Sequence, residues 1–131
     1  MSTPSPFPLH TQLATAHERL LRIHKALIDH ERSRYERTHG RVNSAGEMFQ
    51  LLISDPFFDW LRSLSQLIVA IDEYISSKDP VEAAAGEALL AQAHDLLTPS
   101  DTGTRFQREY QRALQESPDV AMIHAANKLS S

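Results

Sequence analysis

The sequence predicts an all-α fold, an up-and-down four-helix bundle in which proline breaks the second and fourth helices into five to six helical segments. Apolar residues recur along most of the chain with the 3.6-residue period of amphipathic helices, and no stretch alternates as a strand does. Proline also follows aspartate or serine at three places where a new helix can start. The 131 residues suit one domain, and short connections favour antiparallel neighbouring helices.

The longest predicted helix covers residues 9–39, which contain neither proline nor glycine. Its apolar residues fall in one arc of a helical wheel, opposite most of its charged residues. They are Leu9, Leu13, Ala16, Leu20, Leu21, Ile23, Leu27, Ile28 and Tyr35. Gly40 follows at the position where many helices end in a left-handed residue, so we expect the helix to end there.

Two further helices are predicted on either side of the pair Asp55–Pro56. Residues 44–54 begin with Ser44 and carry Glu47 three residues later, the pattern of a capping box. Asp55–Pro56 ends that helix and starts another over residues 56–77. The second of these is the most apolar helix of the chain and is expected at the centre of the core, through Phe57, Trp60, Leu61, Leu64, Leu67, Ile68, Ile71 and Ile75.

The remaining helices begin at similar signals. Asp79–Pro80 predicts a helix to about residue 97, whose alanines suggest a close approach to a neighbour. A turn cluster follows, then a helix over residues 104–116, and Ser117–Pro118 starts the last helix, to about residue 129. If these prolines turn the chain sharply, an orthogonal array of five or six helices is the alternative. Residues 1–8 are expected to form a flexible proline-rich tail, and residues 9–131 one helical domain.

Composition excludes several classes of function. Without cysteine the chain has no disulfides, thiolate metal sites or cysteine nucleophiles. Its net charge of −4 is unlike the basic surface of most nucleic-acid-binding proteins. No apolar run is long enough to span a bilayer, and the first residues lack the features of a secretory signal. We therefore expect a cytoplasmic protein that binds neither membranes nor nucleic acid.

Charge is unevenly distributed along the chain. Residues 17–41 carry seven lysine or arginine residues against four acidic residues, whereas residues 42–101 carry two against ten. Two interpretations remain open. The charges attract between neighbouring helices, or they form an electrostatically biased surface for a partner.

A row of titratable residues follows the first helix. His10, His17 and His24 are spaced by seven residues, and Glu31 continues the register within or beside the apolar arc. One interpretation is a row that flanks the core, with Glu31 paired to an arginine of another helix. A second is a metal or haem site, in which each level of the row supplies one ligand. A third is a pH-sensing seam. The candidate ligands are His17, His24, Glu31, His94, His124 and Asp72.

A candidate partner surface lies on the helix over residues 56–77. Phe58 and Val69 fall outside its main apolar stripe, on the flank that holds Ser65 and Asp72. These four residues are expected to cover a second helix or to bind a partner. Asp72, at the margin of the stripe, is also a candidate general base, although a buried carboxylate is more often paired structurally.

Three segments carry a resemblance. They are HKALIDHER from His24, DPFFDWLR from Asp55 and LIVAIDE from Leu67. With most of the chain past residue 10, they resemble small uncharacterised bacterial all-helical proteins with no assigned activity. The resemblance implies a bacterial, cytoplasmic protein and no particular reaction.

These observations favour a non-enzymatic helical protein that acts through protein–protein interaction or self-association as a homo-oligomer. No nucleotide loop, nucleophile elbow or catalytic triad pattern occurs. The alternative is a helical bundle that binds a metal ion or haem through core-facing histidines. An enzyme with Asp72 as general base is the third hypothesis.

Overall fold

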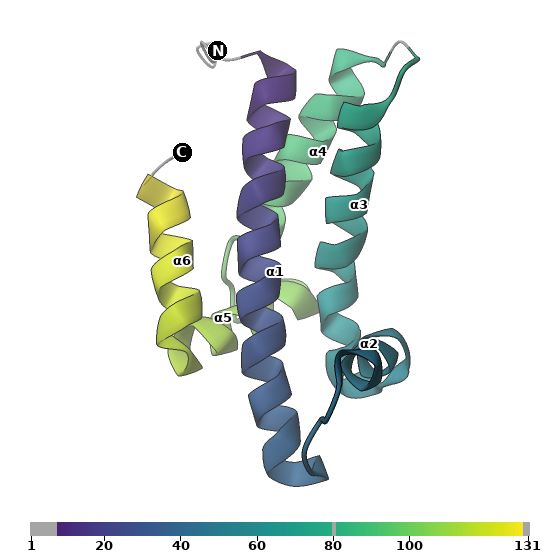
Figure 1. Ribbon diagram of the computed structural model, residues 1–131. Helices are drawn as coiled ribbons and strands as arrows, with labels where there is room; N and C mark the ends of the chain where they lie inside the picture. The colour runs from purple at the N-terminus through teal and green to yellow at the C-terminus, as the bar shows by residue number, and fades with distance from the viewer. Residues whose placement is uncertain (1–7, 80, 130–131) are drawn as a thin grey trace.

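The computed structural model describes residues 8–79 and 81–129, and this part of the chain is all-helical, without a strand (Figure 1). Its elements are α1 (Leu9–His39), α2 (Ala45–Ser54), the 3₁₀-helix η1 (Pro56–Leu61), α3 (Arg62–Ser76), α4 (Ala83–Leu96), α5 (Arg105–Glu116) and α6 (Pro118–Leu129). The predicted all-α class is therefore confirmed. The predicted tail lies outside the described residues except for Pro8.

Helix α1 is the frame of the structure. It is one unbroken helix of 31 residues, and α3, α4 and α6 all pack against it. In Figure 1, α3 and α4 lie on one side of α1 and α6 on the other. Leu13, Leu20 and Leu27, spaced by seven residues, are completely or almost completely buried. The predicted extent of this helix is thus confirmed, and so is its apolar side except at Leu21, which was expected in the buried arc and is 45% exposed.

Two shorter helices have directions of their own. In Figure 1, α2 is seen nearly end-on beside the start of α3, and α5 passes behind α1. The breaks at Pro56 and Pro118 each separate two helices, and the described chain holds six α-helices. The finer arrangement, an up-and-down bundle of four helices, stays a prediction.

Three predicted helix starts have the expected side-chain cap, although the capping box predicted at Ser44 is only half formed, because the Glu47 carboxylate accepts the Asn43 N–H and not that of Ser44. The Ser44 hydroxyl accepts the Glu47 N–H at 3.1 Å, and the Asp55 carboxylate accepts the Phe57 N–H at 2.9 Å. The Ser117 hydroxyl accepts the N–H of Val120 at 3.2 Å. Each side chain replaces a hydrogen-bond partner that the first turn of a helix lacks.

The helix start predicted at Asp79–Pro80 is wrong. Helix α4 begins at Ala83, and Glu82 precedes it without a side-chain cap. The Tyr74 hydroxyl instead donates to the Glu82 carbonyl at 2.9 Å and holds the chain there. The close approach occurs at Gly86, where a Cβ would lie 2.7 Å from the Tyr74 ring. The close approach of α4 to α3 thus depends on Gly86 and not on the alanines that were expected to allow it.

The helix predicted over residues 56–77 begins as a 3₁₀-helix, and this changes which side chains are buried. A 3₁₀-helix has three residues per turn, so residues three apart share one side. Phe58 and Leu61, three residues apart in this 3₁₀-helix, are both buried. Phe57, expected in the core, is half-buried, whereas Phe58, expected on a flank, is 1% exposed.

This difference is testable by truncation. We expect Phe58→Ala to lower the free energy of unfolding by about 3–4 kcal/mol, because it leaves a cavity in the core. Phe57→Ala should lower it by about half as much, since that ring is already partly in water. Denaturant unfolding of the two variants measures the difference. Equal losses, or a larger loss for Phe57→Ala, would contradict the 3₁₀ register.

Candidate functional site

Glu31 is a completely buried carboxylate at the centre of an ion-pair network. It accepts hydrogen bonds from Arg34 Nη1 at 2.7 Å, from Arg112 Nη2 at 2.9 Å and from Trp60 Nε1 at 3.4 Å. Arg112 belongs to α5 and Trp60 to η1. The interpretation that Glu31 pairs with an arginine of another helix is therefore confirmed.

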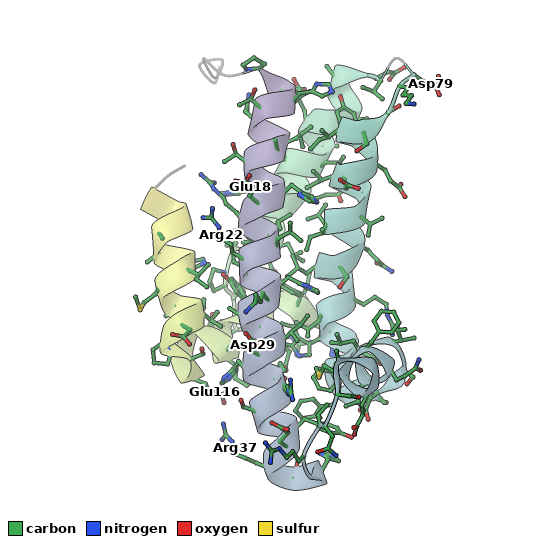
Figure 2. The ribbon with its side chains drawn as sticks, viewed as in Figure 1. Glu18, Arg22, Asp29, Arg37, Asp79 and Glu116 are labelled. Carbon is green, nitrogen blue, oxygen red and sulfur yellow. The ribbon has the colours of Figure 1, made fainter. Side chains whose placement is uncertain are left out.

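The network continues through Glu109 and Glu116 on α5. Arg112 also donates to both of these carboxylates, and Arg34 lies 3.7 Å from Glu116. His30 Nε2 is 3.0 Å from the same Glu116 carboxylate, which Figure 2 places beside the lower half of α1. The network thus fastens α1 to α5 at the corner where α6 begins.

The electrostatics of Glu116 follow from this position. Burial alone would raise the pKa of Glu116. Hydrogen bonds from His30 and Arg112, together with the positive charges of Arg112 and Arg34, outweigh burial and hold the pKa below its usual value. The carboxylate is therefore charged when the network is formed.

Aromatic rings cover the two arginines. The Arg34 guanidinium lies 5.2 Å from the Phe57 ring centroid, and the Arg112 guanidinium lies 5.8 Å from that of Trp60. Such contacts attract a cation to the face of a ring. Every group of this network has a partner within the protein, so its role is structural.

The predicted histidine ligands do not converge. His24 Nε2 lies 2.9 Å from the Ser65 hydroxyl, and His124 Nδ1 lies 2.7 Å from the Tyr110 hydroxyl. His17 is half-buried and His94 is exposed. The described residues contain no group of three histidine or carboxylate side chains that could hold a metal ion. The rise of α1 explains the separation, because each row member sits at its own level.

The His24–Ser65 pair was not predicted from the sequence. Burial lowers the pKa of His24 and so favours the neutral imidazole, whose Nε2 is hydrogen-bonded to the Ser65 hydroxyl. A serine nucleophile also needs a group that orients its base and a space for substrate. Within the described part of the chain, no hydrogen bond engages the other nitrogen of His24, and Ser65 does not line the cleft described below. The pair joins α1 to α3.

Asp72 and Phe58 correct two sequence-based expectations. Asp72 was expected at the margin of the buried stripe, but it is exposed on α3, since Ile68 and Ile71 take the inward positions. Its carboxylate therefore lies in water and not in the packed interior. Phe58 is buried and cannot take part in a surface. Of the predicted partner residues, Val69 is 55% exposed and Asp72 is exposed, while Ser65 is half-buried beside His24.

A different apolar surface lies on α2. Phe49 is 60% exposed and Ile53 is 51% exposed, while Met48 on the opposite side of the helix is buried. We call the exposed side the α2 outer face, and define it as Ala45, Gly46, Phe49, Gln50 and Ile53, all of which are exposed. The signal in the sequence was its apolar width. Met48, Phe49, Leu51, Leu52 and Ile53 cover more of a helix than one core can bury.

A shallow cleft of about 440 Å³ lies between α3, α4 and the start of α5. Leu67, Ala70 and Leu96 form its apolar part. Gln107 at its edge is already bound, because its amide completes a capping box with Thr104 and donates to the Asp95 carbonyl. No histidine lines this cleft, so it provides no general base of that kind.

Comparison with known proteins finds no match for the chain among family models, curated proteins or solved structures. Among the described residues, no helix combines the length and the apolar character needed to cross a bilayer. Function must therefore be argued from the surfaces of this molecule.

Removal of the central carboxylate tests the network. We expect Glu31→Gln to lower the free energy of unfolding by about 3 kcal/mol, because the change leaves two partly buried arginines short of one partner. Glu18→Gln is the matched control on the same helix, since Glu18 is exposed and lies 4.0 Å from Arg22. Its effect should stay within about 0.5 kcal/mol. Similar losses for both variants would contradict a central role for Glu31.

The lowered pKa of Glu116 predicts a pH dependence. The charged form is favoured in the folded state, so the contribution is complete above the ordinary glutamate pKa of about 4.5 and disappears as the pH falls through the lower folded value. Glu116→Gln should therefore destabilise the protein at pH 7, by about 1 kcal/mol at most because the side chain is partly in water. The difference from the wild type should close below pH 4.5. A difference that grows on acidification would refute this account.

Proposed function

We propose that this protein works by binding a protein, either another chain or itself, through the α2 outer face. The observation that carries the proposal is the exposure of Phe49 and Ile53 on one side of a short helix. Single exposed apolar side chains are ordinary, whereas neighbouring ones on a face without charge are typical of an interface. The proposal assigns the protein no chemistry of its own.

The α2 outer face is suited to docking because it is apolar and fixed in place. None of its five residues is charged. The helix is held from behind by buried Met48 and by contacts with η1. A partner that covered Phe49 and Ile53 would gain about 1.5–3 kcal/mol for each side chain removed from water. The surface requires little rearrangement to bind.

Val69 extends the same region along α3. The Arg62 guanidinium donates to the Ile53 carbonyl at 3.1 Å, which places the start of α3 beside the end of α2. Val69 follows Arg62 by seven residues and so shares its side of the helix. The edge of the interface would then include the apolar side chain of Val69 and the charged side chain of Arg62.

The hypothesis of a metal or haem site has less support. Its six candidate ligands do not come together in any group that could hold a metal ion within the described residues. No observation on these residues favours a cofactor. The bacterial setting remains part of the proposal on the resemblance alone, and the cytoplasmic setting on the resemblance and the composition of the sequence.

A crosslinking experiment tests the proposed function. In one variant of this protein a photoreactive amino acid replaces Gln50 on the α2 outer face. In a second variant, the control, it replaces Met122, which is 70% exposed on α6. We expect a protein crosslink from position 50 that Phe49→Ser with Ile53→Ser removes. Met122→Ser should leave that crosslink intact, and the exposed changes should alter the free energy of unfolding by about 1 kcal/mol or less.

The control at position 122 distinguishes binding at the α2 outer face from nonspecific crosslinking. Crosslinks of equal yield from both positions, or a product that survives the double substitution on α2, would overturn the proposal. Mass spectrometry of the product separates self-association from binding to a different chain.

A further inference from the structure

The α2 outer face contains a glycine that the fold does not require. Glycine is among the weakest helix formers, and packing often explains it within a helix. At Gly46 a Cβ would meet only the Ser44 hydroxyl, at 4.0 Å. By contrast, a Cβ at Gly86 would collide with Tyr74 at 2.7 Å. Gly46 thus leaves a low point on an exposed surface, with no neighbour inside the molecule to fill it.

The two ends of the α2 outer face complement each other in size. Gly46 and Ile53 are seven residues apart, so they lie on the same side of the helix, with Phe49 between them. When two copies of α2 pair antiparallel about a two-fold axis, Ile53 of each copy covers Gly46 of the other. Phe49 and Gln50 then lie next to the axis. A surface with this property fits itself, as a two-fold interface requires.

Charge at the two ends supports the same direction. Glu47 is exposed in the first turn of α2. The Arg62 guanidinium, 51% exposed, binds the Ile53 carbonyl at the last turn and also forms an ion pair with Asp59 at 3.2 Å. Antiparallel pairing brings Glu47 of each copy toward Arg62 of the other, once at each end. It also places the positive end of each helix dipole beside the negative end of its partner. Parallel pairing would place like charges together.

We propose that the partner of the α2 outer face is a second copy of this chain, bound through antiparallel α2–α2 contact about a two-fold axis. This inference rests on the proposed function and names its partner. One helix of ten residues from each copy forms the contact, which is smaller than the roughly 800 Å² per partner of a standard interface. The dimer is therefore weak and depends on concentration.

Sedimentation equilibrium of the full chain measures this dimer. We expect the mass to rise from 14.8 kDa toward twice that value as concentration increases. Gly46→Leu should raise the dissociation constant at least tenfold, because the new side chain occupies the place of Ile53 from the other copy. Its thermal midpoint should equal or exceed that of the wild type, since the space around Gly46 is open within the subunit. Met122→Ser is the control and should leave dimerisation unchanged.

Charge reversal tests the antiparallel direction. Arg62→Glu should weaken the dimer, since it places two acidic side chains together at each end. Adding Glu47→Lys to Arg62→Glu should restore affinity to within a few-fold of the wild type. Glu47 also accepts the Asn43 N–H, so circular dichroism of each variant checks that α2 is retained. Failure of the second change to rescue a folded protein would overturn the antiparallel arrangement.

Spin labels locate the interface independently. The chain has no cysteine, so Gln50→Cys provides one labelling site and Gln92→Cys on α4 a control site. We expect a short distance between the two copies from position 50 and a longer one from position 92. A dimer with the reverse order would place the contact elsewhere and refute the inference.

A chain that stays monomeric at every concentration would also refute the second-copy inference. It would leave the proposed function standing if the crosslink from position 50 reached a different protein. The two hypotheses therefore fail by different measurements.

Discussion

The buried carboxylate of Glu31 is the constraint on which the packing of this protein depends. A charge removed from water must be paired and hydrogen-bonded, or its burial is strongly unfavourable. Arg34 meets part of this need from the same helix, but Arg112 and Trp60 must come from α5 and η1. The position of Glu31 therefore determines where two other elements can lie. Apolar contacts alone would allow more sliding of helices past each other.

The same constraint determines how α2 is presented. Trp60 donates to Glu31, and its ring packs against Phe106 of α5 at a centroid distance of 5.3 Å. The 3₁₀-helix that carries Trp60 follows α2 after one residue, Asp55, which caps it. Helix α2 is thus held against η1, beside the start of α3 (Figure 1), with Met48 inward. Phe49 and Ile53 are left facing solvent because the interior at this end is already filled by Phe58 and Leu61.

Long periodic elements with clear end signals were predictable from the sequence. Helix α1 has 31 residues without a breaker, so its arc of apolar residues could be assigned to the core. The start at Pro56 was also predictable, but its 3₁₀ geometry was not. A change from 3.6 to three residues per turn exchanges the roles of Phe57 and Phe58, and both are equally apolar. The predicted start of α4 was wrong because the Tyr74 hydroxyl binds the Glu82 carbonyl, a contact from α3 to the residue before α4 that no local sequence pattern indicates.

The candidate site was predictable only in part. That Glu31 needs a cation followed from its place in the apolar arc, yet nothing local distinguishes Arg112 from the other arginines. The α2 outer face could not be predicted, because α2 has five large apolar residues and the sequence does not show which of them are buried. His24 and His124 were correctly placed near the core, but their partners Ser65 and Tyr110 depend on how the helices are arranged in space. A carboxylate that waits for a residue 81 positions later has one more consequence, for synthesis. Until the ribosome has made α5, Glu31 remains hydrated, so the middle of α1 cannot pack against its neighbouring helices. The final packing around Glu31 is therefore completed only after α5 has been made.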